Sequence, residues 1–231
     1  MSFLKEKLEI YADKTIFTVD EMKECFQHIP KNLPEYFKHI PKKIFSEEMQ
    51  TEDMSKNTIK SCAGFINLFK RSILFCSPFD MQFSFKGDKM HFRLGSFPVD
   101  VSQFIDIHPA EQFLQYAPEN MKNNVRCVMR LKTNMYYKSS VPMLLHHPFW
   151  HVPKLVASPG LLTKNKELNL NIFFFISNNQ ENFIIKKGDP LVYITFLTEK
   201  KVKFKYKTIE KKQSLLLKTF SRLKKYTMNM L

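Results

Sequence analysis

Glycine is scarce in this chain of 231 residues, with five copies, whereas phenylalanine occurs 23 times. Core and interface area should therefore come mainly from aromatic packing rather than from close backbone approach. The four cysteines, Cys25, Cys62, Cys76 and Cys127, lie far apart in apolar contexts and form no CxxC pair. This spacing argues against a zinc site and predicts buried free thiols in a reducing compartment.

Long hydrophobic runs are also missing. No segment reaches the roughly 18 uninterrupted apolar residues that a membrane span requires, so we expect no membrane-spanning segment. The first stretch, MSFLKEKLEIYADK, mixes acidic residues into its first turns and has no apolar core of the kind that a secretory signal needs. These two observations predict an intracellular or virion protein.

The short motifs of common catalytic sites do not occur in this chain. It contains no G-x-S-x-G, no G-x-x-x-x-G-K-[ST] and no G-x-G-x-x-G, so neither a nucleophile elbow nor a phosphate-cradling loop is predicted. Signatures of helix-turn-helix, zinc-finger and RNA-recognition domains are missing as well, so a case for nucleic acid depends on charge alone. We therefore predict no catalytic residue and no cofactor.

Positive charge is what the chain has in excess. The formal net charge is +14, from 36 Lys and Arg against 22 Asp and Glu, and lysines crowd residues 200–225. Such an excess favours contact with nucleic acid, an acidic protein or an anionic surface, and a solvated, solubilising face explains it equally well.

The most regular basic segment is KVKFKYKTI, residues 201–209. Its alternation places apolar residues on one side and lysines on the other, which predicts an edge strand whose lysine row blocks strand addition by another chain. The same strip would suit a phosphate backbone. The candidate contacts for nucleic acid or another anion are Lys203, Lys205, Lys207, Lys211, Lys212 and Arg222.

Residues 1–71 are predicted to form a helical N-terminal section packed on the core. Thr18 and Glu21 have the spacing of a capping box, and the apolar residues that follow predict a helix over residues 19–28, before Pro30. A second helical piece is expected after Pro34, and an amphipathic helix over about residues 59–69. Polar residues 46–57 between them are typical of a surface loop.

At Ser72 the hydrophobic period changes from helical to two, which predicts a β domain over residues 72–209. Residues 81–85 and 90–94 alternate and flank a Gly-Asp turn, as the strands of a hairpin do. Residues 125–131 alternate again, with Arg126 and Arg130 facing outward. The expected fold class is mainly β, within α+β: an antiparallel β-sandwich or jelly roll, followed over residues 210–231 by a C-terminal amphipathic helix.

The stretch from Val141 to Leu197 organises this domain. Residues 168–177 are strongly β-prone, and four consecutive apolar residues, 172–175, predict a strand buried on both faces. Residues 183–185 and 191–197 are predicted strands that flank a turn at residues 186–190. Gly188 supplies the positive φ that such a turn needs, and Asp189 is expected to form the turn rather than to act as a general base.

Histidines cluster once in the chain, in the segment HHPFWH at residues 146–151. Adjacent residues on a strand point to opposite faces, and no carboxylate lies close in sequence, so we expect hydrogen-bonded histidines at a strand end rather than a metal site. A metal-dependent, cupin-like enzyme centred on this segment is an alternative. The candidate ligand-binding residues are His146, His147, Trp150, His151, Lys164, Lys186 and Lys187.

The order VPMLLHHP, a Pro-Gly turn at Pro159 and Gly160, a long apolar strand and IIKKGDPLVYITF resembles a family of tailed-phage and bacterial proteins. More distantly, it is similar to the closing half of the dUTPase and dCTP deaminase fold, over about the last 110 residues. This resemblance implies a dUTPase-like β core. In those nucleotide hydrolases a loop between these strands provides an aspartate that activates water. The corresponding residues 161–166, LLTKNK, contain no carboxylate, so pyrophosphatase chemistry is not expected.

The sequence therefore predicts a non-catalytic viral protein whose β domain serves assembly or recognition, in the virion or the host cytoplasm. Its expected partners are other copies of the chain, other phage proteins, or non-specifically bound nucleic acid or another anionic partner. The alternatives are a nucleotide-binding or nucleic-acid-binding protein with a degenerate dUTPase-like fold, and the cupin-like enzyme.

Overall fold

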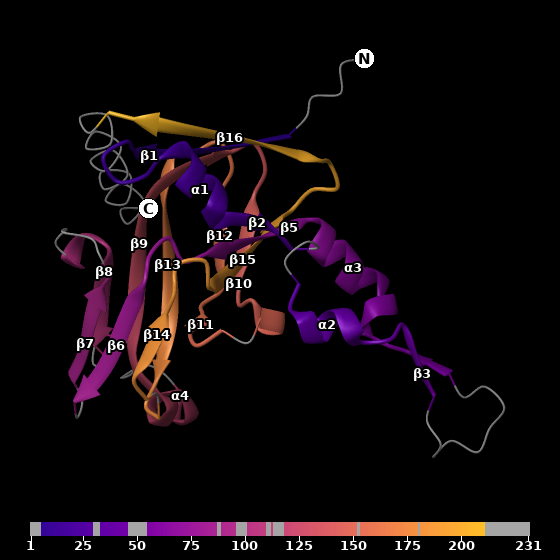
Figure 1. The fold of residues 1–231 in the computed structure, drawn as a ribbon, viewed down its shortest axis with the longest axis horizontal. Helices are drawn as coiled ribbons and strands as arrows, with labels where there is room; N and C mark the ends of the chain where they lie inside the picture. The colour runs from indigo at the N-terminus through magenta and orange to yellow at the C-terminus, as the bar shows by residue number, and fades with distance from the viewer. Residues whose placement is uncertain are drawn as a thin grey trace.

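The computed structural model describes residues 6–29, 33–45, 55–86, 89–95, 101–109, 112, 118–151, 153–179 and 181–210. Strands predominate in this part of the chain, so the predicted mainly β class is confirmed (Figure 1). The predicted C-terminal helix, together with Lys211, Lys212 and Arg222, lies outside the described residues. None of the described helices is long and apolar enough to cross a membrane.

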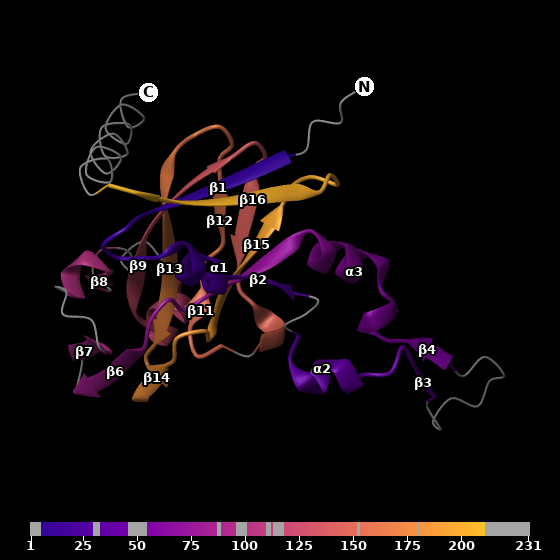
Figure 2. The same cartoon turned by 45° about the horizontal axis from the view of Figure 1, so that its top comes forward.

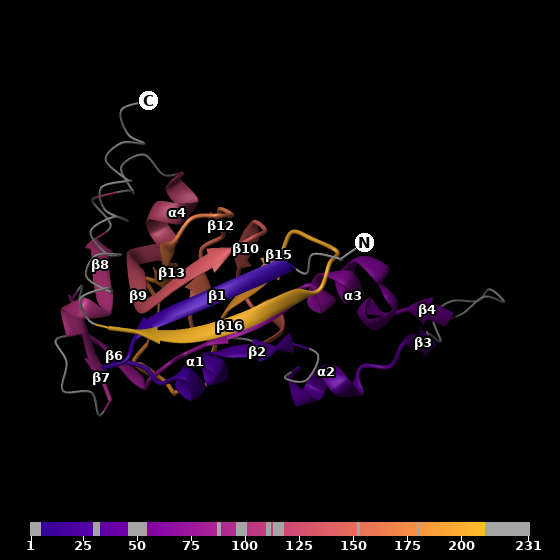
Figure 3. The same ribbon diagram turned by 90° about the horizontal axis from the view of Figure 1, so that it is seen from above.

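A six-stranded sheet forms one layer of the fold. β1 lies between β9 and β16, antiparallel to the first and parallel to the second. Seen from above, β1 and β16 run side by side across the molecule (Figure 3). The order is β11 (Val156–Ala157), β13 (Leu168–Ser177), β9 (Val125–Ser139), β1 (Glu6–Asp13) and β16 (Val202–Ile209), with β8 (Ile105–Pro109) also paired to β9.

A five-stranded sheet forms the second layer, and two smaller sheets complete the β structure. The five-stranded order is β12 (Gly160–Leu162), β10 (Met143–His146), β15 (Pro190–Phe196), β5 (Ser72–Cys76) and β2 (Phe26–His28). The smaller sheets are β14 (Phe183–Ile185), β6 (Met81–Lys86) and β7 (Lys89–Leu94), and the pair β3 (Lys43–Phe45) and β4 (Ser55–Asn57).

The helices are short and lie mostly at the N-terminal end of the chain. In Figure 2, α2 and α3 lie beside the five-stranded sheet, and β3 and β4 project away from it. The α-helices are α1 (Val19–Cys25), α2 (Glu35–His39), α3 (Ala63–Lys70) and α4 (Glu119–Asn124), and the 3-10 helices are η2 (Ile59–Ser61), η3 (Val101–Gln103) and η6 (Phe149–His151).

The main core lies between the two large sheets and includes side chains of the three-stranded sheet. Ile10 of β1, Phe75 of β5 and Phe83 of β6 belong to this one cluster, and each is at most 1% exposed. A second cluster lies on the other side of the five-stranded sheet, where Leu74 and Tyr193 pack with residues of α2 and α3 such as Phe37. The five-stranded sheet is thus covered on both faces.

The predicted helical N-terminal section needs correction, because it also contains the strands β1, β2, β3 and β4, the last of them within the predicted loop of residues 46–57. α1, α2 and α3 form, but residues 6–13 are the strand β1 rather than part of a helical section. The alternation in EKLEIYAD buries Leu8, Ile10 and Ala12, and this period of two fits the sheet position between β9 and β16. The N-terminal section therefore contributes a central strand to the β core.

The first predicted helix is confirmed at its start and is shorter at its end. The Thr18 hydroxyl accepts from the Glu21 N–H at 3.2 Å, and the Glu21 carboxylate accepts from the Thr18 N–H at 2.9 Å, so the capping box is present. The helix ends at Cys25, because Phe26 to His28 pair with β5 as strand β2. Here the pairing of strands overrides the helical period of the sequence.

The strands of the C-terminal half follow the prediction with two differences. β13 spans residues 168–177, but Phe173 is 38% exposed, so the strand is buried on one face and not on both. β14 and β15 flank the expected turn, in which Gly188 has a φ of 90° and the Asp189 carboxylate accepts from the Lys186 N–H at 2.8 Å. They belong to different sheets, since β14 pairs with β6 and β15 lies between β10 and β5.

Three of the four cysteines are buried free thiols, as predicted, and burial raises the pKa of Cys25 and Cys76 to about 12. The prediction is wrong for Cys62, which is exposed. Cys62 is the N-cap residue of α3, and its side chain stays at the surface where that helix begins. The β6–β7 hairpin is confirmed, with residues from Met81 to Lys86 paired in register with β7.

A candidate anion-binding face

The histidine segment serves to hold neighbouring strands together. Nε2 of His146 lies 2.8 Å from the Thr195 hydroxyl, and Nδ1 of His151 lies 2.7 Å from the Tyr193 hydroxyl, so both contact β15. Nδ1 of His147 accepts from the Ala157 N–H at 3.2 Å. Burial lowers the pKa of both His146 and His147, which favours neutral rings.

The remaining residues of the predicted ligand site have separate surroundings. Trp150 packs against Phe37 and Phe65, with ring centroids 5.3 and 5.1 Å apart, and so anchors α2 and α3 to the β core. Lys164 is exposed in the turn after β12, and Lys186 is exposed in the turn before β15. Lys187 forms an ion pair with Glu24 at 3.2 Å.

Two further observations concern a possible metal site and the carboxylates of Asp80 and Asp189. Within the described ranges, no three or more His, Cys, Asp or Glu side chains gather in a group that could hold a metal ion. The exposed carboxylate of Asp80 accepts from the Lys187 N–H at 2.7 Å, and that of Asp189 closes its own turn. Both carboxylates thus have structural partners.

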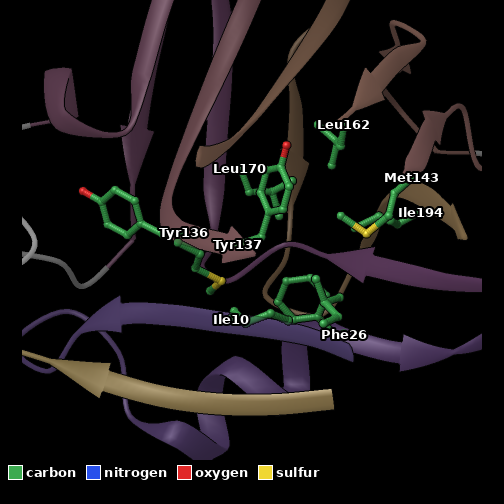
Figure 4. Close-up of a pocket in the computed structure, with 10 residues that line it drawn as sticks. Ile10, Phe26, Tyr136, Tyr137, Met143, Leu162, Leu170 and Ile194 are labelled. Carbon is green, nitrogen blue, oxygen red and sulfur yellow. The ribbon is translucent and has the colours of Figure 1, made fainter. Parts of the chain in front are cut away.

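A small cavity lies between the large sheets beside Leu162 (Figure 4). Its volume is about 10 Å³, which is about the space of one water molecule. Tyr137 is 3% exposed, and its buried hydroxyl has no hydrogen-bond partner in the described part of the chain; burial raises the pKa of Tyr137 to about 12. This cavity beside Leu162 is therefore too small for a nucleotide. The lining residues are Leu8, Ile10, Phe26, Met135, Tyr136, Tyr137, Met143, Leu162, Leu170 and Ile194.

Basic side chains instead gather on the outer face of the six-stranded sheet. Because side chains alternate along a strand, those that flank the buried residues of β9, β1 and β16 point away from the core. The strand register places Lys7 beside Lys203 and Glu9 between Lys138 and Lys205. The basic residues of this outer face are Lys7, Arg130, Lys132, Lys138, Lys203, Lys205 and Lys207.

The pKa of Glu9 reflects the positive potential at the β1–β16 end of the outer face. The Tyr11 hydroxyl donates a hydrogen bond to its carboxylate, and Lys207, Lys205 and Lys138 add attraction. Together they lower the pKa of Glu9 against the opposing effect of burial. The Lys207 ammonium also lies 5.6 Å from the centre of the Tyr11 ring, within the range of a cation–π contact.

Asp106 is the carboxylate at the β8 end of the outer face. The Lys132 ammonium lies 2.6 Å from one of its oxygens, and the Arg130 guanidinium contacts the other. Burial alone would raise the pKa of Asp106, but the hydrogen bonds from Lys132 and Arg130 outweigh it and lower this pKa. Two cations share one carboxylate here, so a net positive charge is left.

The structure places only part of the predicted anion contacts on this face. Lys203, Lys205 and Lys207 are exposed on β16, which is the edge strand that the sequence predicts. The outward position of Arg130 follows the predicted alternation of β9. Arg126 does not follow it, because β9 has a register shift there and the Arg126 guanidinium lies 4.6 Å from the centre of the Phe85 ring of β6, beside the main core. Sequence reasoning missed that Lys7 and Lys138 join the lysine row, although the alternation of residues 6–13 was a usable signal.

Comparison with known proteins gives no relative, since no family model, curated protein or solved structure matches this chain. The outer face is where the described basic side chains are most regularly arranged.

Proposed function

We propose that this protein acts by recognition rather than catalysis, and that the outer face of its six-stranded sheet binds a polyanion, with nucleic acid as the favoured class. The observation that carries the proposal is the run of Lys and Arg at alternate positions of β9 and β16, joined through Lys7 of β1. A role in the virion or the host cytoplasm is in keeping with the resemblance to phage proteins.

The spacing of these cations suits a chain of phosphates. Side chains two residues apart on one face of a strand are about 6.6 Å apart, so Lys203, Lys205 and Lys207 present three separate charges along β16. None of the three has a carboxylate within ion-pairing distance among the described residues. Their charges are therefore available to a ligand.

The proposal supposes that binding is driven by release of counterions from the nucleic acid. We expect the wild-type protein to bind a labelled oligothymidylate of about twelve nucleotides, and the logarithm of its affinity to fall linearly with the logarithm of salt concentration. For single strands the slope is about 0.7 per phosphate contact, so four or more contacts give a slope of about −3 or steeper. Fluorescence anisotropy over a range of salt concentrations measures it. A slope near zero, or no binding at low salt, would rule out a polyanion ligand.

Self-assembly is a second candidate function, and the uncharged edge strands β11 and β12 favour it. β16 carries lysines, but β11 and β12 at the opposite edges are short and uncharged, and they expose Val156 at 52% and Leu161 at 63%. An edge strand without charged residues is open to pairing with another chain. We therefore propose that a second copy of this chain pairs here.

Light scattering coupled to size exclusion tests the assembly candidate. The wild-type protein should elute as an oligomer, and Val156→Lys combined with Leu161→Lys should convert it to a monomer, because two lysines block strand pairing. Lys70→Glu, an exposed change on α3, serves as the control and should leave the oligomer intact. A wild-type monomer at all concentrations would refute this candidate without affecting the anion-binding proposal.

A further inference from the structure

Aromatic rings lie beside the cations on one part of the outer face. Phe173 lies on β13, in the middle of the six-stranded sheet, and its side chain is 38% exposed. A phenyl ring so exposed contributes little hydrophobic stabilisation to the fold. The neighbour of Phe173 on the same face is Phe175, which is half-buried. The ring of His108, from β8, lies 6.1 Å from that of Phe173 at an interplanar angle of 37°.

Strand register places these rings next to charged and apolar partners. Across β8, β9 and β13 one row reads Asp106, Arg130 and Phe173. The next row reads His108, Val128 and Phe175, and continues to the exposed Val156 of β11. The aromatic and apolar side chains of these rows, His108, Val128, Phe173 and Phe175, form a floor, with Arg130 between Asp106 and Phe173 and Lys132 next to Arg130 along β9.

The polar groups beside this floor share one carboxylate. Nε of Arg130 and Nε2 of His108 are buried, without a hydrogen-bond partner among the described residues, and so are not themselves open to a ligand. Lys132 and Arg130 both bind the single carboxylate of Asp106, so a phosphate could replace or share that partner. A ligand with both a flat ring and an anionic oxygen would match the floor and its cationic side.

We infer that the part of the outer face formed by Phe173, Phe175, His108, Arg130 and Lys132 is a stacking platform for the unpaired bases of single-stranded nucleic acid. Every base has a π-face that can stack on a phenyl ring, whereas in a duplex those faces are already stacked on one another. The phosphates then lie toward Arg130 and Lys132 and continue toward the lysines of β16. This inference rests on the proposed anion-binding function and names the ligand class for it.

Replacing one exposed ring tests the platform. Phe173→Leu keeps an apolar residue on the strand but removes the stacking surface, and we expect it to weaken binding of a labelled oligothymidylate by roughly tenfold. Phe173→Trp, which restores a ring, should bind as well as the wild type. The matched control is Phe149→Leu, because Phe149 is also exposed, at 74%, but lies in η6 away from this face. Thermal unfolding checks that each variant is folded.

Competition experiments with unlabelled nucleic acids identify which form of nucleic acid the platform binds. An unlabelled single strand should displace the probe at a lower concentration than a duplex of equal length, and single-stranded DNA and RNA arms show which sugar is preferred. Equal binding by Phe173→Leu and wild type, or equal competition by the duplex, would overturn the platform while leaving the polyanion proposal in place. No binding of the probe by the wild type would overturn both. If Phe173→Leu instead dissolves a wild-type oligomer and leaves probe binding unchanged, a second copy of this chain occupies the platform, and the inference is wrong.

Discussion

Replacing Ile10 by alanine is expected to lower the free energy of unfolding by about 2 to 5 kcal/mol, the usual cost of truncating a buried aliphatic side chain. Ile10 is 1% exposed and lies on β1 between β9 and β16. It also lines the small cavity between the two large sheets, so truncation enlarges a space that the neighbouring side chains already leave unfilled. The loss should therefore lie above the low end of this range.

The control for this prediction is Lys7→Ala on the same strand. Lys7 points to the outer face and is exposed, so its replacement should change the stability by no more than about 0.5 kcal/mol. Denaturant unfolding followed by circular dichroism compares the two variants with the wild type. Equal and small effects of both changes would mean that residues 6–13 do not form a core strand.

Neutralising Lys203, Lys205 and Lys207 together, each to glutamine, is expected to weaken nucleic-acid binding by about a hundredfold at low salt. The estimate takes ~1 kcal/mol for each lysine near an anionic surface. The salt slope should also become shallower by about 2, since three phosphate contacts of about 0.7 each are lost. Folding should be unaffected, because all three side chains are exposed on an edge strand.

A second triple variant separates this effect from a general loss of charge. Lys42, Lys43 and Lys70 are also exposed, but they lie in the segment of β3 and α3, away from the six-stranded sheet. Changing these three to glutamine removes the same net charge and should reduce affinity only slightly. If both triple variants lose affinity equally, binding depends on net charge alone and the outer face has no special role.

Much of the fold could be predicted from hydrophobic period, because most strands bury one face. The alternation of residues 81–85, 90–94 and 125–131 led to β6, β7 and the first part of β9. The error at β1 has a physical cause. The alternation of residues 6–13 is as regular as that of β6, β7 and β9. Lysine and glutamate, however, have a low intrinsic preference for strands, so this segment becomes a stable strand only by pairing with β9 and β16. Likewise, Phe26 to His28 leave the helical period because β5 offers them a partner.

The candidate site was predictable only in pieces. The lysine row of residues 203–207 and the outward Arg130 of β9 follow from local alternation, which needs no knowledge of the sheet order. Their union on one face depends on the parallel pairing of the first strand with the last, and residues so far apart give no local signal of that contact. The histidines, in contrast, were expected to be hydrogen-bonded at a strand end, and the bonds of His146 and His151 to β15 have this character.

Ultraviolet crosslinking of a single-stranded oligothymidylate to the wild-type protein, followed by peptide mapping, tests the central claim most directly. We expect crosslinked peptides from β9, β13 and β16, with Phe173 among the crosslinked residues, and we expect salt to reduce the yield. Crosslinks confined to the segment of residues 33–70, or spread evenly over the surface, would contradict the claim that the outer face of the six-stranded sheet is the binding surface.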